Sequence, residues 1–413
     1  MSTRDVLVSV ELNGIVQRVG ELHVGFVRGH ETVSFTYAAE WLASPERFAL
    51  APALMLSEGS FQPPAQQTLH APLTDSAPDR WGRTLMRREE RRRARAEHRT
   101  PRTLRESDYL LGVNDRVRQG ALRFQLGEHG PYLEQDGSAS IPPFVALPRL
   151  LTATRDLETD EDEATDDALA LLLAPGSSLG GARPKASVIS PDGALWIAKF
   201  PKSDDTYRVE VWEAVVLTLA RSAGLHVEEF DLRRVAGADV LLVKRFDRRG
   251  TSRTPYLSSM GLLNAADGEM RSYVEIAEAI RTHGADAKAD LEELWRRLVF
   301  TIRVSNLDDH LRNHGFLHVG TAGWRLSPVF DVNPVPADIR SGFLSTAIGA
   351  DGDSTASVER ALEVREEFLL SDETTRTILS EVDLAVRVWR DVARTLGAGS
   401  GEIDRMASAF QSR

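Results

Sequence analysis

The chain has 413 residues, of which 42% are hydrophobic and 27% are charged, and its formal net charge is −11. This composition is typical of a globular protein, and the length predicts two or three domains rather than one core. The absence of cysteine excludes disulfides, thiolate metal sites and a cysteine nucleophile, and the acidic balance makes the chain by itself a poor binder of nucleic-acid phosphates.

The N-terminal region predicts strands. Residues 6–12, 24–27 and 32–37 are rich in β-branched and aromatic residues and are separated by turns that contain glycine. The N-terminus is polar and lacks the apolar run of a signal peptide, and nowhere do about 18 apolar residues follow one another, as a membrane span needs. We therefore expect a cytoplasmic protein without a membrane partner.

A strongly basic run, RWGRTLMRREERRRARAEHRTPRTLR, occupies 80–105. Its residues favour a helix, which Pro101 would end. Such a helix is either a solvated face held by Glu–Arg pairs or a docking surface for an acidic partner or DNA. We favour the solvated face, because charge runs usually serve solvation.

Composition rich in Gly, Pro and Ser at 126–145 predicts a domain boundary. We expect a β-rich N-terminal subdomain with the basic helix (1–125), a part with a Gly-rich loop and a lysine-bearing strand (146–250), and a helical C-terminal part (251–413). Within the last part, amphipathic periodicity at 356–396 indicates packed helices.

The segment GSSLGGARPKASV at 176–188 is a candidate phosphate-binding loop, because glycines let backbone N–H groups approach a phosphate closely. It is not a Walker A loop, since Ala182 and Arg183 stand where Lys and Ser/Thr are required. By itself such a loop is equally typical of a flexible turn.

The next segments, ASVIS, PDG and ALWIAKFP, predict a β-hairpin whose second strand carries Lys199. Protein kinases hold ATP phosphates with a lysine in this position. A helix predicted at 206–223 carries one charge in its apolar centre, Glu213. A buried carboxylate needs a cation, so we predict an ion pair between Lys199 and Glu213, with Glu210 as the rival partner.

Two further segments fit the same order. ADVLLVKRFDRRG (238–250) predicts a strand that could connect two lobes and offer backbone groups to adenine. In NLDDHLRNHGFLHVG, Asp308 and Asn313 have the Asp-x-x-x-x-Asn spacing of a kinase catalytic loop, and Asp331 follows after a predicted hairpin. Asp308 would take the proton of an acceptor hydroxyl, while Asn313 and Asp331 would bind Mg²⁺ through oxygen.

The three histidines His310, His314 and His318 allow a second interpretation. With the neighbouring carboxylates they could ligate zinc or manganese in a metallohydrolase. That interpretation requires 310–318 to form one helix, whereas the glycine and the TAG turn that follow favour a strand for His318. A histidine-rich loop without a metal is a third possibility. The four preceding elements, in kinase order, favour a kinase.

The sequence resembles the HipA family, the serine/threonine kinase toxins of bacterial type II toxin–antitoxin modules. The resemblance covers most of the chain and implies an α+β, two-lobed protein-kinase-like fold related to phosphoinositide-type kinases, with a β-rich N-terminal subdomain and an all-helical C-terminal lobe. The segments that carry it are SAPDRWGR (76–83), SLGGARPK (178–185), WIAKF, LLVKRFDR (241–248), LDDHLRN (307–313) and LSPVFDVNP (326–334).

The resemblance also implies ATP and Mg²⁺ as cofactors and a role for each matching residue. Asp308 would be catalytic, and Ser178, or the adjacent Ser177, would be the autophosphorylated serine whose modification switches the kinase off. Asn313 and Asp331 would be the magnesium ligands. ATP contacts would come from Lys199, Ser178, Leu179, Gly180, Gly181, Lys244, Phe246 and His310.

Two residues depart from the family pattern. Asp309 stands where many members have glycine, which would put an extra carboxylate beside the metal site, and Lys244 stands where a glutamate often precedes Arg-Phe-Asp. Neither departure removes a catalytic group, so the sequence favours an active kinase.

Family members are bound by a small helix-turn-helix antitoxin, the pair sits on its operator DNA, and the known target is an aminoacyl-tRNA synthetase, notably the glutamyl enzyme. The resemblance therefore implies a growth-arresting kinase toxin. The alternative is a catalytically weak kinase relic that serves as antitoxin partner and transcriptional co-repressor.

Overall fold

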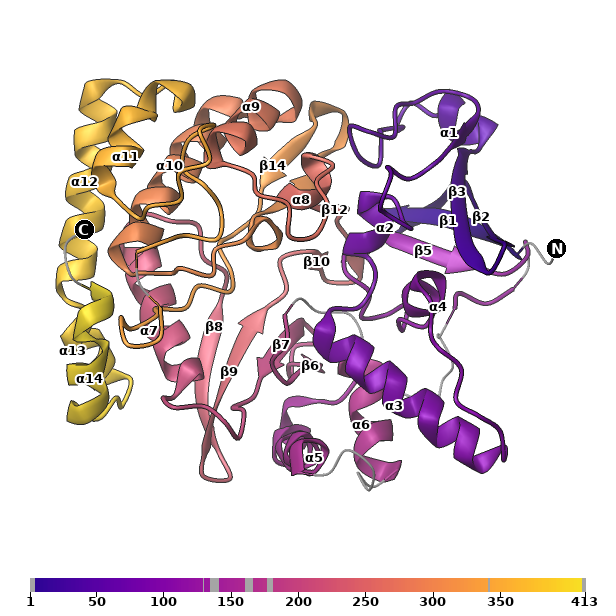
Figure 1. The fold of residues 1–413 in the computed structure, drawn as a ribbon, viewed down its shortest axis with the longest axis horizontal. Coiled ribbons are helices and arrows are strands. Elements are labelled where there is room, and N and C mark those ends of the chain that lie inside the picture. The colour runs from indigo at the N-terminus through magenta and orange to yellow at the C-terminus, as the bar shows by residue number, and fades with distance from the viewer. Residues whose placement is uncertain are drawn as a thin grey trace. The chain divides into compact units, whose positions relative to one another are not determined.

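Figure 1 shows the fold of a computed structural model of the chain. The structure describes residues 4–128, 130–133, 141–159, 166–176, 181–340 and 342–410. Contacts divide the chain into two compact units, one formed by Met1–Asp204 with Arg234–Leu257 and the other by Asp205–Arg233 with Ser258–Arg413. The domain boundaries expected from the sequence stay predictions.

The first unit begins with a five-stranded sheet of order β4-β3-β2-β1-β5. Val6, Val8 and Val10 lie on one face of β1 and are fully buried, as the two-residue period of a strand requires. The strands predicted in the first 37 residues are confirmed. The strands are β1 (Arg4–Leu12), β2 (Ile15–Val27), β3 (His30–Tyr37), β4 (Ser60–Phe61) and β5 (Leu122–Gln125), and the short helices nearby are α1 (Ala39–Ala43), α2 (Ala71–Asp75) and α4 (Glu106–Leu111).

The basic run forms helix α3 (Arg80–Ala96), which ends before Pro101. The Asp79 side chain accepts a hydrogen bond from the Gly82 backbone N–H at 2.6 Å and so caps the helix. On the inner face of α3, Trp81 and Leu85 join one hydrophobic core with α5 (Leu147–Thr159), α6 (Asp166–Gly176) and the following strands. The helix therefore has a packed face as well as a charged one.

The second sheet has the order β6-β7-β9-β8, and its strands are β6 (Lys185–Ile189), β7 (Leu195–Lys199), β8 (Phe230–Val235) and β9 (Ala238–Lys244). Strands β6 and β7 pair antiparallel, with Lys185 opposite Lys199, which confirms the predicted hairpin. A two-stranded ribbon of β10 (Arg248–Arg249) and β11 (Ser252–Arg253) follows β9.

A buried ion cluster ties the end of β9 to the loop before β5 inside the first unit. Asp247 accepts hydrogen bonds from Arg245 Nε at 2.8 Å, from Arg248 Nη1 at 2.8 Å and from the Gly120 backbone N–H at 2.8 Å. Arg245 also donates to the Val117 carbonyl at 2.6 Å. Burial alone would raise the pKa of the Asp247 carboxyl, but the two guanidinium charges outweigh it and hold that pKa far below its usual range.

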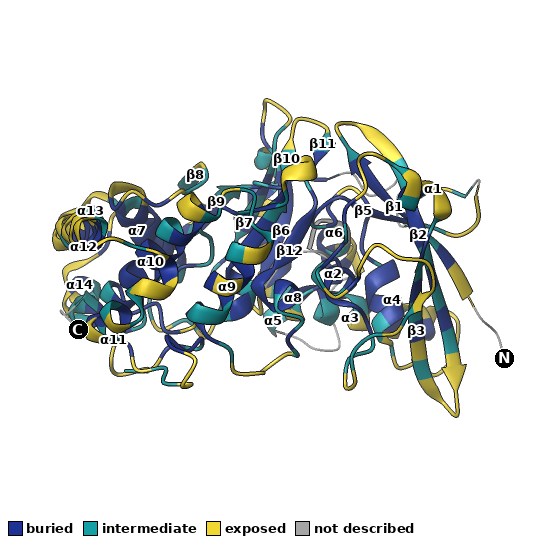
Figure 2. Cartoon of the chain, turned by 90° about the horizontal axis from the view of Figure 1, so that it is seen from above, coloured by how far each residue is buried: buried dark blue, intermediate teal, exposed yellow. Residues whose placement is uncertain are grey.

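The second unit is mainly helical rather than all-helical as expected, because Gly315–His318 and Trp324–Leu326 form paired strands within it. Helix α7 (Val209–Ser222) packs against α12 (Asp372–Arg387) and α13 (Trp389–Thr395), and α10 (Ala287–Arg303) packs against α9 (Tyr273–His283) and α12. Figure 2 shows that α7 is buried along most of its length. The helix predicted before Gly224 and the helices predicted in 356–396 are confirmed. The remaining helices are α8 (Ser259–Leu262), α11 (Val358–Glu363) and α14 (Ser400–Met406).

A small sheet of order β12-β13-β14 accompanies these helices, with β12 (Tyr256–Ser258), β13 (Gly315–His318) and β14 (Trp324–Leu326). Strands β13 and β14 pair antiparallel, with His318 opposite Trp324, which confirms the predicted hairpin around the TAG turn. In the described part of the chain, no helix is both long and apolar enough to cross a membrane.

The Asp247 cluster predicts a specific stability loss. Asp247→Ala would leave two buried guanidinium groups without their counter-charge, so we expect the free energy of unfolding of the first unit to fall by about 3–5 kcal/mol, measured by urea unfolding at pH 7. Asp204→Ala is the control, because the Lys202–Asp204 pair is exposed and its loss should leave the transition in place. An equal loss of free energy of unfolding in both variants would show that the Asp247 cluster stabilises the first unit no more than the exposed pair does.

Candidate catalytic loop and cation site

The loop that carries Asp308 begins where α10 ends. Ser305 adopts a left-handed conformation with φ +50°, and the chain then turns through 306–310 into the short 3₁₀ helix Leu311–Asn313. Asp308 is exposed and Asn313 is buried. The Nδ2 atom of Asn313 donates a hydrogen bond to the Asp308 carbonyl at 3.2 Å, so the two residues that the sequence singled out lie at the closing ends of one loop.

The segment that carries Asp331 lies against this loop. The Asn333 backbone N–H donates to Asn306 Oδ1 at 3.1 Å, and the Val335 backbone N–H donates to the Ser305 carbonyl at 3.0 Å. Asp331 itself has φ +56°, a conformation that non-glycine residues adopt at a cost of about 1–3 kcal/mol and that is frequent at functional sites. The structure thus holds Asp331 in a specific, strained turn next to the candidate catalytic loop.

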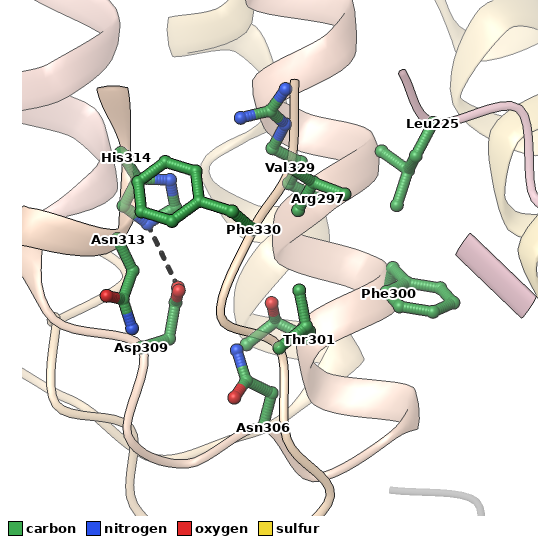
Figure 3. A pocket seen from close by; sticks show the side chains of 11 residues that line it. Leu225, Arg297, Phe300, Thr301, Asn306, Asp309, Asn313, His314, Val329 and Phe330 are labelled. Carbon is green, nitrogen blue, oxygen red and sulfur yellow. Dashed lines mark hydrogen bonds and ion pairs between the residues drawn. The ribbon is translucent and has the colours of Figure 1, made fainter. Parts of the chain in front are cut away.

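A small cavity of about 10 Å³, room for about one water molecule, lies between these two segments and α10. Figure 3 shows its lining from close by: Asp309, Asn313 and His314 come from the loop, and Val329 and Phe330 come from the residues just before Asp331. Both segments therefore share one packed interface.

Asp309 points into the protein and away from solvent, with 4% of its surface exposed. Its Oδ2 atom accepts a hydrogen bond from the Tyr273 hydroxyl. The same atom lies 3.0 Å from His314 Nε2, the contact marked by the dashed line in Figure 3. Burial, and then the Asp309 charge, raise the pKa of Tyr273, which keeps its hydroxyl protonated as a donor. Burial alone would raise the pKa of Asp309, but His314 and the two hydrogen bonds outweigh it and lower that pKa. The extra carboxylate is therefore occupied by interior partners.

The three histidines do not share a helix. His310 precedes the 3₁₀ helix, His314 follows it and pairs with Asp309, and His318 lies on β13. In the described ranges no group of three His, Cys, Asp or Glu side chains is placed to hold a metal ion. The helix that the metallohydrolase interpretation required is absent there, because β13 begins at Gly315.

The oxygen ligands expected for Mg²⁺ fit the local geometry in part. Asn313 turns its amide nitrogen toward the Asp308 carbonyl, which leaves its Oδ1 atom for a cation. His310 keeps a buried Nδ1 atom without a hydrogen-bond partner among the described residues, so a polar group is available beside Asp308. Asp308, Asn313 and Asp331 are the hard oxygen donors that Mg²⁺ prefers, and their roles stay predictions.

The residues predicted to contact ATP lie mostly in the first unit. Ser177, Ser178, Leu179 and Gly180 lie outside the described residues. Gly181 is described and has φ +101°, which glycine adopts without strain. Lys199 is half-buried at the end of β7, and Lys244 and Phe246 are half-buried at the end of β9. Their predicted contacts with ATP stay predictions.

Glu213 and Glu210 are both buried on α7, each 2% exposed, as expected for carboxylates that need a partner inside the protein. Lys199 belongs to the first unit and Glu213 to the second. The predicted ion pair between them therefore stays a prediction.

The sequence resemblance included SAPDRWGR without giving it a role, and the structure supplies one. The Trp81 backbone N–H donates to the Gly181 carbonyl at 3.3 Å, and Trp81 Nε1 donates to the Lys185 carbonyl at 3.0 Å. Lys185 Nζ lies 3.2 Å from Asp79 Oδ2, and both side chains are almost fully buried. The start of α3 therefore anchors the strand end of the Gly-rich segment, a contact that the residue types alone did not reveal.

The fold class is α+β, a kinase-like fold in two units, as predicted. Residues 9–104 match the HipA N-terminal domain family, and residues 177–389 match the HipA-like C-terminal domain family. The chain belongs to the HipA family.

One solved structure and two curated proteins are similar to this chain. The HipA chain in the structure of the Shewanella oneidensis MR-1 toxin–antitoxin system HipA, HipB and its operator DNA superposes with a TM-score of 0.67 at 16% identity, over 98% of this chain and 95% of that one. Two curated proteins with provisional kinase names are similar in sequence. The one from Haemophilus influenzae is 24% identical over 45% of this chain and 61% of its own length, and the one from Sinorhizobium fredii is 26% identical over 49% of each. The matched region thus spans about half to three fifths of these relatives.

The environment of His318 predicts a pH dependence of stability. Burial lowers the pKa of His318 from 6.5 to about 4, so the folded protein keeps the ring neutral where the unfolded chain binds a proton. Above pH 6.5 the ring is neutral in both states, so His318 does not reduce the free energy of unfolding. As the pH falls from 6.5 to about 4, the unfolded chain binds a proton that the folded protein does not, and the free energy of unfolding falls by about 3 kcal/mol at most. Unfolding titrations of the second unit between pH 4 and 7 measure this loss.

His318→Phe is the matched variant, because a phenyl ring can keep the edge-on contact with Trp324, whose ring centroid lies 5.1 Å away. Its stability should vary less with pH over that interval. A slope identical to that of the wild type would show that His318 is not the responsible group.

Proposed function

We propose that the chain is an ATP- and Mg²⁺-dependent protein serine/threonine kinase that acts as a growth-arresting toxin in the cytoplasm. The observation that carries this proposal is the packing of the 306–314 loop against the segment around Asp331, through the Asn306–Asn333 hydrogen bond and the cavity that both segments line. The loop with the Asp-x-x-x-x-Asn spacing thus meets the segment that carries Asp331. Of the two carboxylates in the loop, Asp308 is the one that faces solvent.

Each residue has a proposed role in this chemistry. Asp308 would orient the acceptor hydroxyl and accept its proton, because an exposed carboxylate can reach a protein substrate. Asn313 and Asp331 would hold Mg²⁺, which when bound neutralises charge on the terminal phosphates of ATP. Lys199 would position those phosphates, with Glu213 fixing the lysine in an ion pair. The adenine contacts would come from backbone groups near Lys244 and Phe246.

We further propose self-inactivation and a partner. A phosphate on Ser178, or on Ser177, would add about −1.5 to −2 charges to a loop that receives another phosphate, and so would switch the enzyme off. The structural neighbour was solved with HipB and its operator DNA, which supports a small helix-turn-helix antitoxin and, through it, operator DNA as partners. The protein substrate in this proposal is an aminoacyl-tRNA synthetase of the glutamyl type.

The first test replaces the proposed proton acceptor. Asp308→Asn should lower phosphate transfer by about 10²–10⁴-fold, the usual contribution of a general base, and should leave the melting temperature unchanged because the side chain is exposed. Wild-type protein made in bacteria should carry a mass increment of about 80 Da for one phosphate, and the variant should lack it. Wild type that never transfers phosphate from ATP with Mg²⁺ would instead support the kinase relic that acts as antitoxin partner and co-repressor.

The second test concerns the basic helix. Glu89 pairs with Arg92 at 2.8 Å and with Arg93 at 2.6 Å, whereas Arg87 and Arg91 are exposed and have no carboxylate partner within the described ranges. We propose that these two arginines approach DNA carried by the antitoxin.

Arg87→Ala combined with Arg91→Ala should weaken operator binding by the complex and reduce its salt slope by about 2, close to one unit per lost phosphate contact. Arg92→Ala is the neighbouring control, because the Arg93–Glu89 pair persists. Operator affinity and salt dependence should be measured for the complex with its antitoxin. Unchanged values in the double variant would remove the DNA role.

A further inference from the structure

The segment that follows Asp331 returns to the catalytic loop as a fixed ledge, which we define as residues 342–348. On one side the Leu344 backbone N–H donates to the Ser354 carbonyl at 2.8 Å, and on the other the Ala347 backbone N–H donates to the Arg271 carbonyl at 2.9 Å. From the ledge, Thr346 Oγ1 donates to the Asp309 carbonyl at 2.7 Å. Backbone bonds on both sides therefore hold the ledge in register with the loop.

Ser345 is the side chain of the ledge that touches the catalytic carboxylate. Its hydroxyl lies 3.1 Å from the Leu307 carbonyl and 3.4 Å from Asp308 Oδ1. Because a hydroxyl has one proton, it divides this donation between a fixed backbone oxygen and the carboxylate. Asp308 is otherwise exposed, so this contact restricts a side chain that would rotate freely in solvent.

Arg340 adds a positive charge to the same point. Its Nη1 atom donates to Ser345 Oγ at 3.3 Å, and no carboxylate pairs with it among the residues that the structure describes. The nearby Asp338 is already paired with Arg405 at 2.9 Å. The serine hydroxyl thus lies between the guanidinium and Asp308, and the guanidinium can bind another acid.

Two exposed apolar side chains stand close to Arg340 in the chain. Ile339 is 52% exposed and Phe343 is 58% exposed, and both lie within a few residues of Ser345 in the chain. An arginine with neighbouring exposed apolar side chains is suited to a protein segment that has both apolar and acidic residues.

We propose that Ser345 is a positioning residue for Asp308 and that Arg340 selects protein substrates with an acidic residue beside the acceptor serine or threonine. This proposal rests on the proposed kinase function and names its substrate class. A guanidinium binds a carboxylate through two parallel hydrogen bonds, so it distinguishes acidic from neutral neighbours. A chain with net charge −11 otherwise repels acidic partners, so a local cation beside Asp308 is needed to bring such a segment to the site.

The test of Arg340 uses three synthetic peptides that contain one serine flanked on both sides by Asp, Ala or Lys. The wild type should phosphorylate the Asp peptide with a kcat/KM about tenfold or more above that of the Ala peptide, as hydrogen bonds to charged groups provide. Arg340→Ala should bring the ratio of kcat/KM for the Asp and Ala peptides close to one, and Arg340→Glu should transfer the preference to the Lys peptide. Arg376→Ala, at an exposed arginine on α12, should behave as wild type.

The outcomes separate the two proposals. A wild type that autophosphorylates but ignores the Asp peptide, or an Arg340→Ala variant that keeps the acidic preference, overturns the role of Arg340 and leaves the kinase intact. A wild type that neither autophosphorylates nor phosphorylates any peptide overturns the kinase function, and the substrate class falls with it.

The test of Ser345 compares alanine and threonine. Ser345→Ala should lower kcat for the Asp peptide by about tenfold through loss of orientation, with the KM for ATP and the melting temperature unchanged. Ser345→Thr retains the hydroxyl and should recover most of the rate. A purely structural role would lower the melting temperature in both variants, and an unchanged kcat in Ser345→Ala would exclude the positioning role.

Discussion

The hydrogen bond from the Asn333 backbone to the Asn306 side chain joins the two segments on which the site depends. Asn306 and Asp308 belong to a loop, and Asp331 belongs to a turn whose positive φ costs energy. Neither segment has regular structure that would fix it alone, so their mutual bonds and the shared cavity lining must do so. Because Asn306 is buried and Asn333 is half-buried while Asp308 is exposed, these bonds fix the backbone of the loop, and only the side chain of Asp308 remains to be oriented.

Buried charge pairs perform the same task in the first unit. Asp247 links β9 to the loop at Gly120, and the Asp79–Lys185 pair links α3 to β6. Removing both members of such a pair can be neutral, whereas breaking it is costly. The motif residues Arg245 and Asp247 therefore act in this structure as fixed connections between segments distant in sequence, a role distinct from the adenine contact expected of the same strand.

The sequence predicted local elements well because their signals are local. Alternation in 6–12, the PDG turn before Lys199 and the glycine after α7 each determine one element through nearby residues. It did not predict which distant groups meet. Nothing in the letters of SAPDRWGR indicates that Trp81 bonds to Gly181 and Lys185, because these contacts arise only when a helix and a hairpin far apart in the chain are packed together.

Asp309 shows the same limit at the candidate site. From its place in the sequence, Asp309 is expected to put an extra carboxylate beside the metal site. A fully buried carboxylate without partners would be too costly to keep, yet Tyr273, from a different helix, and His314, five residues along, both meet its Oδ2 atom. Those partners turn the group inward. An aspartate in place of the glycine next to Asp308 can therefore turn away from the exposed surface of the loop, provided that the interior supplies hydrogen-bond donors for its carboxylate.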